Sequence, residues 1–426
     1  MTYGDVAEAA WAWVRQQVRW EDGRPWIPEY GGGEKPDEYG DGMHSGIGGL
    51  AYTLAEIRLT RPWTASEQEL ATAIGDHVRA IVPVSTSTTF FEGLVSSIGI
   101  LEALDEPGTD AALQRIQDLA TDDGWPESTF ARPTYEPGAF GNDVTLGTGA
   151  ILLGALWAMR RGQDASAPAR QAAELLMGEK EELPTGLNWQ FVSRRFLSSE
   201  PAEMPNFTHG LAGIAAALAV AGVELGQPEL IEAARRGAEH LITIGINDDK
   251  GFRVARIIPW AERHGDEFTF NWCHGGAGTA LLFSALEYAD VKQVADEPPE
   301  TWHRRCLDSV RYSGIPERLH PGFWDNDGRC CGTAGVGDAF LDTGDDRDLE
   351  FAVRMGDTLL DHAHHEGTHA YWRFIEHRNG DPLLPPGVGW MQGAAGIAAY
   401  LFRLQRVLSG DQRVVDRMDN WWALRP

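Results

Sequence analysis

The stretch that decides the fold is HGGAGTALLFSALEY, at residues 274–288. It contains no proline, opens on glycines and small residues, and continues with apolar side chains that would fall on every side of a helix. A helix that is apolar all round is stable only when it is buried on all sides. This stretch therefore predicts an inner helix of the protein.

Runs of the same kind occur seven times along the chain. Each opens on a glycine, and these leading glycines recur 47 to 65 residues apart: Gly46, Gly93, Gly147, Gly210, Gly275, Gly332 and Gly393. The other six runs are SGIGGLAYTLAEI, EGLVSSIGILEAL, LGTGAILLGALWAM, HGLAGIAAALAVA, CGTAGVGDAFL and QGAAGIAAYLFRL. Self-similarity at such spacing is the signature of a repeat architecture. We expect the small residues to let the N-termini of the helices crowd together.

Amphipathic segments fill the intervals between these runs. Two of them are PELIEAARRGAEHLITIG at 228–245 and DLEFAVRMGDTLLDHA at 348–363, and their period predicts outer helices with one solvated face. Each repeat is then an outer helix, a loop and an inner helix, and seven repeats predict an all-α fold, an α/α toroid of seven helical hairpins. Ring closure removes the need for capping repeats. No low-complexity linker divides the chain, so residues 1–426 are predicted to form one domain; the alternative is a generic bundle of glycine-rich helices.

The net charge of the chain argues against one class of protein. The formal net charge is −27, which argues against nucleic-acid binding, since that needs a basic surface. The same charge suits a substrate peptide of basic character.

No apolar stretch is long enough to span a membrane. The first residues, MTYGDVAEAAWAWVRQQV, lack a basic segment before an apolar core. They are typical of an amphipathic helix, not a signal peptide, and we expect a cytoplasmic protein.

The loops before the inner helices should all reach one end of the ring. Residues that lie just before the leading glycines would then line one shared mouth. Seven residues with useful chemistry occupy such positions: His44, Asp143, His209, Cys273, His274, Cys330 and Cys331. The last four belong to neighbouring repeats, the fifth and the sixth, so three thiolates can converge from two loops.

A cluster of three cysteines suits a zinc ion, which binds thiolates in a tetrahedral arrangement. The fourth cysteine, Cys306, lies in WHRRCLDSVRYS, a predicted outer helix, and is expected to be an inert buried thiol. Three protein ligands leave one position open, which is typical of a catalytic zinc site. We therefore predict Cys273, Cys330 and Cys331 as the ligands; the alternative is that His274 replaces one of them.

The motif Trp272-Cys273-His274-Gly275, followed by a second cysteine motif in the next glycine-led repeat, resembles the lanthionine synthetase C family over essentially the whole chain. Where the family usually has Cys-His-Gly, this chain has Cys330-Cys331-Gly332. The resemblance implies an α/α toroid, a bound Zn²⁺ and Michael-type addition of a cysteine thiolate to a dehydrated residue of a peptide. A zinc ion with four thiolates has a net charge of −2, which should make the bound thiolate more nucleophilic.

By the same resemblance, His209 and Asp143 match the acid–base histidine and aspartate of the family. The position of His209 near a helix N-terminus predicts a lowered pKa and a neutral imidazole. For Asp143 the competing interpretation is a helix N-cap. We expect His44 and His274 to contact the substrate. The chain has no kinase motif and no dehydratase-sized extra domain, so the implied partner is a dehydrated precursor peptide made by another protein, a kinase/lyase or a dehydratase.

Three other functions compete with peptide cyclisation. Residues 267–271, EFTFN, lack the arginine that peptide cyclases of the family often have before the Trp-Cys motif; addition of a glutathione-type thiol is therefore an alternative. A zinc-stabilised module that binds peptides without catalysis is another. A toroidal glycosidase could use Glu92 and Asp143 as its paired carboxylates, but this function leaves the cysteines without a role.

The sequence also contains a match to a second zinc motif. His365-Glu366-Gly367-Thr368-His369 fits the HExxH pattern of zinc peptidases. That motif needs a helix, whereas this stretch has a glycine inside it. We predict a connection on the outside of the ring with no metal function.

Overall fold

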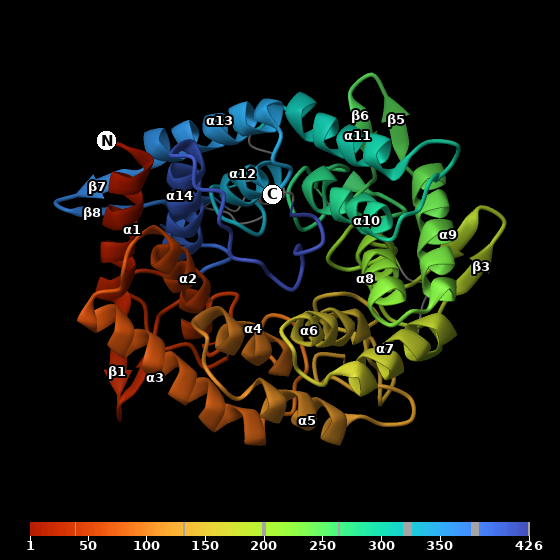
Figure 1. Ribbon diagram of the computed structural model, residues 1–426, viewed down its shortest axis with the longest axis horizontal. Coiled ribbons are helices and arrows are strands. Elements are labelled where there is room, and N and C mark those ends of the chain that lie inside the picture. Colours follow the sequence, from red (N-terminus) through yellow and green to blue (C-terminus); the bar gives the residue numbers. More distant parts are fainter. Residues whose placement is uncertain are drawn as a thin grey trace.

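The computed structural model describes residues 1–38, 40–130, 133–197, 202–262, 265–317, 326–375 and 383–424. Fourteen α-helices in these residues form two concentric rings (Figure 1). The inner ring consists of α2 (Leu50–Thr60), α4 (Leu94–Leu104), α6 (Thr148–Arg160), α8 (Leu211–Glu224), α10 (Gly276–Tyr288), α12 (Thr333–Leu341) and α14 (Ala394–Leu408). The outer ring consists of α1 (Tyr3–Gln17), α3 (Ala65–Ile81), α5 (Thr109–Leu119), α7 (Ser166–Gly178), α9 (Pro228–Ile244), α11 (Pro299–Tyr312) and α13 (Asp346–His362).

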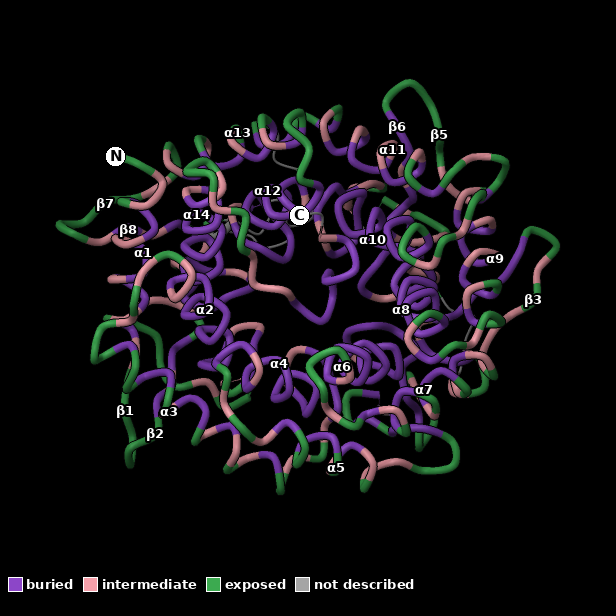
Figure 2. The backbone as a smooth tube through the Cα atoms, in the orientation of Figure 1, coloured by how far each residue is buried: buried purple, intermediate pink, exposed green. Residues whose placement is uncertain are grey.

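The seven glycine-led runs form the inner ring, as predicted. In α8 every residue from Leu211 to Gly222 is buried, because inner helices contact both the neighbouring inner helices and the outer ring. The outer helices bury one face only, and Figure 2 shows buried chain inside the ring and exposed chain around its rim. The prediction of an all-α toroid is confirmed.

The order of packing within a hairpin differs from the prediction. Each of α5, α7, α9, α11 and α13 packs mainly on the inner helix that precedes it, not on the one that follows. The reason is loop length: α8 and α9 are separated only by residues 225–227, and short connections keep antiparallel helices adjacent. The seventh pair is α14 with α1, so the first helix of the chain closes the ring.

The leading glycines also act differently from the prediction. A Cβ atom at Gly332 would lie 1.8 Å from the carbonyl oxygen of Asn326, and one at Gly210 would lie 1.9 Å from that of Met204. The obstacle is therefore backbone six residues earlier in the same loop, not a neighbouring helix. The loop folds back so that the N–H of Thr333 donates to the carbonyl of Asn326 at 2.7 Å. Only glycine permits this close approach.

Five two-stranded antiparallel ribbons connect helices in the described part of the chain, and they were not predicted from the sequence. Four follow an outer helix directly, and a fifth lies before α14. The pairs are β1 (Arg19–Glu21) with β2 (Arg24–Trp26), β3 (Glu181–Leu183) with β4 (Gly186–Asn188), β5 (Ile246–Asp248) with β6 (Gly251–Arg253), β7 (His364–Glu366) with β8 (His369–Tyr371), and β9 (Arg373–Ile375) with β10 (Leu383–Pro386).

The segment after α14 crosses the ring at the C-terminal ends of the inner helices (Figure 1). Arg413 donates to the carbonyl of Leu59 at the end of α2, and the indole N–H of Trp422 donates to the carbonyl of Leu281 in α10. This end of the central axis is therefore covered by the chain itself, and the mouth lies at the N-terminal ends of the inner helices. Among the described helices, none is long and apolar enough to cross a bilayer.

Candidate metal centre

The loops before α10 and α12 bring the three predicted sulfur atoms together. The Sγ atoms of Cys273, Cys330 and Cys331 all lie within 4.8 Å of one another, and those of Cys330 and Cys331 are 3.4 Å apart. Tetrahedral zinc with bonds of about 2.3 Å to sulfur separates its ligands by about 3.8 Å. The three buried thiols are thus spaced as zinc ligands are, with little rearrangement needed.

The protonation of the three thiols is linked. Hydrogen bonds from Cys330 and Cys331, with help from the charge of His274, lower the pKa of Cys273 well below its usual range. Hydrogen bonding to Cys273 is in turn the largest cause that raises the pKa of Cys330 and of Cys331. One thiolate is favoured at the cost of the other two, because three buried negative charges repel each other. A divalent cation would remove that conflict.

Two side chains that the sequence analysis did not assign tie the cysteine loops together. Asn271 donates to the carbonyl of Cys331 at 3.4 Å, and its side-chain oxygen accepts from the N–H of His274 at 3.0 Å. Thr208 donates to the carbonyl of Cys273 at 2.9 Å. Both residues lie shortly before a leading glycine, and this position could have marked them as residues of the mouth. The sequence does not show which backbone groups their side chains bind.

His209 and Asp143 form a pair at the same mouth. Nδ1 of His209 lies 2.8 Å from Oδ2 of Asp143. Asp143 is completely buried and also accepts from the hydroxyl of Thr145 at 2.6 Å and from the N–H of Leu146 at 3.1 Å. It is not a helix N-cap, since Gly147 holds that position in α6.

The predicted direction of the His209 pKa was wrong. Burial does lower the pKa of His209, but the hydrogen bond and the charge of Asp143, together with the charge of Cys273, outweigh burial and raise it above the usual value. The carboxylate contact decides the outcome because it is short and shielded from water, whereas a helix N-terminus acts weakly. The protonated form of His209 is therefore stabilised relative to that of a free imidazole.

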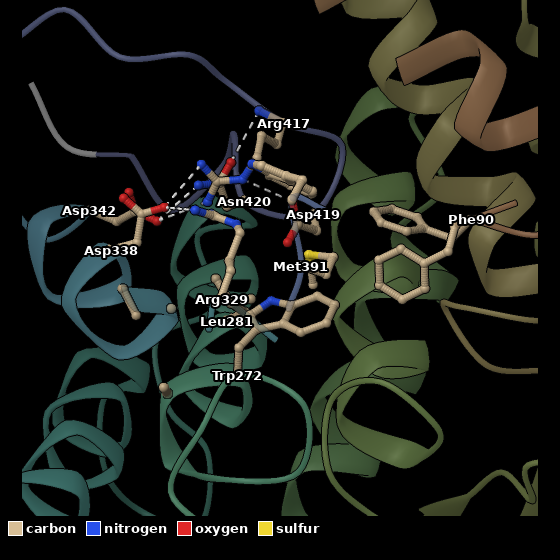
Figure 3. Close-up of a pocket in the computed structure, with 15 residues that line it drawn as sticks. Phe90, Trp272, Leu281, Arg329, Asp338, Asp342, Met391, Arg417, Asp419 and Asn420 are labelled. Carbon is tan, nitrogen blue, oxygen red and sulfur yellow. Dashed lines mark hydrogen bonds and ion pairs between the residues drawn. The ribbon is translucent and has the colours of Figure 1, made fainter. Parts of the chain in front are cut away.

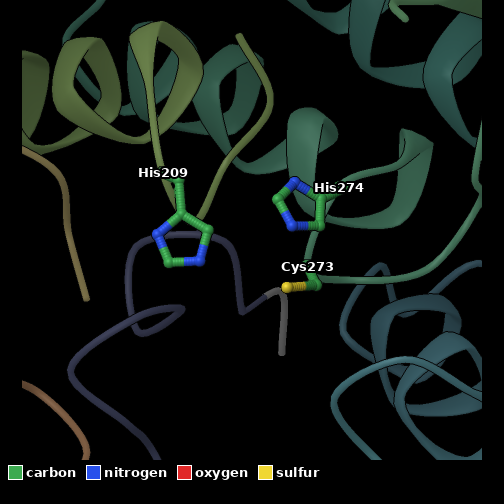
Figure 4. Close-up of side chains that lie close together, drawn as sticks. All are labelled: His209, Cys273 and His274. Carbon is green, nitrogen blue, oxygen red and sulfur yellow. The ribbon is translucent and has the colours of Figure 1, made fainter. Parts of the chain in front are cut away.

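His274 lies across the mouth from His209. The centroids of the two imidazole rings are 5.4 Å apart, and one ring nitrogen of each lies within 4.8 Å of Cys273 Sγ (Figure 4). This second group of potential ligands shares only Cys273 with the first. The alternative in which His274 replaces a cysteine therefore has a geometric basis, but the three sulfur atoms form a complete set without it.

His44 and Glu92 occupy the first two loops of the mouth. His44 packs edge-on against Phe91 with ring centroids 5.1 Å apart, and burial lowers its pKa to about 4, opposed by the charge of Cys273. Burial also raises the pKa of Glu92 to about 8, although Glu92 accepts from the N–H groups of Gly42 and His44. The imidazole of His44 is thus neutral, and Glu92 holds its loop in place.

The competing motifs lie away from the mouth. His365 is in β7 and His369 begins β8, so the HExxH match is a hairpin, not a helix. Cys306 is buried in α11, and burial raises the pKa of its thiol, as expected for an unreactive cysteine. The predicted burial of Cys306 in an outer helix is confirmed.

A small cavity separates the cysteine loops from the segment after α14 (Figure 3). Trp272 and Arg329, which directly precede Cys273 and Cys330, line it from one side, and Arg417 and Asp419 line it from the other. Buried arginines and aspartates meet there in a network of ion pairs. This network could not be predicted from the sequence, because only tertiary packing brings its members together.

Comparisons with known proteins agree with this architecture. The sequence profile described as lanthionine synthetase C-like protein matches residues 37–409. No curated protein sequence matches the chain. Among solved structures, nisin cyclase aligns with a TM-score of 0.60 at 15% identity, over 87% of this chain and 90% of that one. A GH76 alpha-mannanase of Bacteroides thetaiotaomicron aligns with a TM-score of 0.52 at 13% identity, over 96% and 98%.

Identities this low show a shared fold and nothing about the reaction, and the mannanase has the same toroid. The family profile is the more specific finding because it covers most of the chain, including both cysteine motifs. The chain belongs to the lanthionine synthetase C-like family.

Proposed function

We propose that this protein is a zinc-dependent cyclase that forms lanthionine or methyllanthionine thioethers. The reaction is Michael-type addition of a cysteine thiol of a peptide to a dehydroamino acid of the same peptide. The observation that supports it is the convergence of three buried sulfur atoms with the His209–Asp143 pair at one mouth. A toroidal glycosidase would need none of these sulfur atoms.

The residues fit a resident zinc ion. Cys273, Cys330 and Cys331 would hold it, since their sulfur atoms are buried and mutually within 4.8 Å. When bound, zinc keeps a coordinated thiol deprotonated at neutral pH. Three protein ligands leave a position for such a thiol, as in other catalytic zinc sites.

His209 is the proposed proton donor. As the new S–C bond forms at the β-carbon, the electrons of the C=C bond move toward the neighbouring carbonyl, and the α-carbon then needs a proton. Asp143 raises the pKa of His209 and so stabilises its protonated form. Asp143 also fixes the ring through Nδ1, so that Nε2 is the nitrogen left to donate. The proton lost by the thiol restores His209, and the sum is addition of S–H across the double bond.

His44 and His274 are the proposed substrate contacts. The ring of His274 faces that of His209, and the charge of Cys273 acts on the pKa of His44, which belongs to a different loop. A neutral His44 can donate or accept one hydrogen bond with a peptide group without adding charge. Aromatic side chains nearby, Phe91 and Trp272, have ring centroids 6.1 Å apart and offer an apolar surface beside the dehydrated side chain.

The proposed substrate is a dehydrated precursor peptide, which a separate kinase/lyase or dehydratase must supply. A net charge of −27 favours a peptide with basic residues. A cytoplasmic location, which the sequence predicts, agrees with such partners.

A second candidate is addition of glutathione to dehydroamino acids. The absence of an arginine from residues 267–271 favours it. A non-catalytic peptide-binding module is the third possibility.

One pair of assays distinguishes the three functions. The purified protein, with zinc, is incubated with a dehydrated peptide that contains a cysteine, and separately with a dehydroalanine peptide plus glutathione. Thiol alkylation followed by mass spectrometry counts the free thiols that remain. We expect loss of the free thiol in the first assay. Product in the second assay alone would favour glutathione addition, and no product in either would leave the binding module.

A further inference from the structure

Arg329 directly precedes Cys330 and is almost completely buried. The guanidinium group lies over the ring of Trp390, with 4.6 Å from its central carbon to the ring centroid. It also forms an ion pair with Asp338 of α12. Figure 3 shows it in the lining of the cavity, next to Trp272 and Leu281.

The backbone of the same residue anchors the cysteine pair. The N–H groups of Arg329 and Cys330 both donate to the carbonyl oxygen of Met391, each at 2.8 Å. Met391 follows Trp390 in the loop before α14. Arg329 thus attaches the Cys330–Cys331 loop to the next loop of the ring through both its side chain and its backbone, and to α12 through Asp338.

Arg329 belongs to a buried network of ion pairs. Asp338 also contacts Arg403 at 2.8 Å and lies 3.6 Å from Arg417, and Asp342 and Asp419 pair with the same two arginines. The charge of Arg329 also acts on the neighbouring thiol of Cys330, where it opposes the larger effects of Cys273 and of burial that raise the pKa of that thiol. A zinc ion with three thiolates has a net charge of −1, and a fourth thiolate makes it −2. Buried charge of this kind is unstable without a nearby counter-charge.

We propose that Arg329 is a positioning residue of the zinc centre, which holds the Cys330–Cys331 loop in place and supplies the positive charge that a three-thiolate site requires. This inference rests on the proposed function only in that the three cysteines bind zinc. It assigns Arg329 no contact with the peptide.

The test is the zinc affinity of the folded, full-length protein, measured by competition with a chromophoric chelator. We expect Arg329→Met to bind zinc roughly 10- to 100-fold more weakly than the wild type, the usual range for residues that support metal ligands. Arg329→Lys should recover part of the affinity, because it restores the charge but not the planar guanidinium. With cobalt in place of zinc, Arg329→Met should shift the thiolate-to-metal absorption bands.

Arg406→Met is the matched control. Arg406 is equally buried and forms an ion pair with Glu56, but it lies in the second half of α14. Its loss should lower the unfolding temperature and leave the zinc affinity unchanged. Equal zinc affinities for Arg329→Met, Arg406→Met and the wild type would overturn the inference. No zinc binding by the wild type would instead overturn the proposed metal centre.

A failure of Arg329→Met to fold does not end the test. Arg329→Lys and Asp338→Asn are then compared with the wild type. Weaker zinc binding by both, with unchanged helical content, supports the inference. Wild-type affinity in both contradicts it.

Discussion

The loop before α6 and the loop before α12 have the same backbone but different chemistry. In the first, the N–H of Thr148 donates to the carbonyl of Gly141 at 2.8 Å, and in the second the N–H of Thr333 donates to that of Asn326 at 2.7 Å. Both loops end in a glycine in close contact with the start of the loop. One presents Asp143 and the other presents Cys330 and Cys331. The two loops therefore share one backbone conformation, and the side chains that each loop presents decide its chemistry.

The largest expected effect is that of removing one of the three cysteines of the metal centre. Cys273→Ala should abolish zinc binding and thioether formation, because the two sulfur atoms that remain cannot hold a catalytic zinc ion. Metal analysis and the free-thiol assay measure the two losses. Cys306→Ser is the control and should change neither. A Cys273→Ala protein that kept both zinc and activity would refute the ligand assignment.

The second prediction concerns the carboxylate loop. His209→Asn and Asp143→Asn should each reduce turnover by about 10²- to 10⁴-fold, the usual contribution of a general acid, and should retain zinc. The free-thiol assay gives the rate and metal analysis gives the zinc content. Loss of zinc in either variant would show that the two loops do not have separate roles.

The third prediction tests whether the shared backbone needs its glycines. Gly332→Ala and Gly147→Ala should each lower the free energy of unfolding by about 3 kcal/mol, because a Cβ atom would overlap backbone atoms 1.8 Å and 2.2 Å away. Gly178→Ala is the control, since nothing lies within 4 Å of its Cβ position. Urea denaturation measures all three. A stable Gly147→Ala protein would mean that the two loops are not equivalent.

The fourth prediction concerns Glu92 in the loop before α4. Its folded pKa of about 8 lies above the ordinary value of 4.5, so the folded state binds the proton more tightly than the unfolded state. The resulting stabilisation is present below pH 4.5 and is lost as the pH rises to about 8. In Glu92→Gln this loss should vanish, so the unfolding temperature should fall less between pH 5 and pH 9 than in the wild type. Identical pH profiles would contradict the assignment.

Several features of the site could be predicted from the sequence. The seven glycine-led runs predicted the ring and placed the candidate residues at one mouth, because a local pattern of small and apolar residues decides which helices are buried. The two cysteine motifs in neighbouring repeats then predicted which thiols meet. The structure places Asp143 and His209 together as well, which the resemblance implied but the spacing alone did not.

Other features depended on tertiary packing. The pairing of α14 with α1, the raised pKa of His209 and the ion pairs of Asp338 with Arg403 and Arg417 all join residues that are distant in the chain. The sequence by itself determined the helices, their burial and the positions of the cysteines, since these follow from local patterns and repeat order. Only the tertiary structure decided which charges face each other, because electrostatic interactions depend on distance and burial, and neither is set until the ring closes.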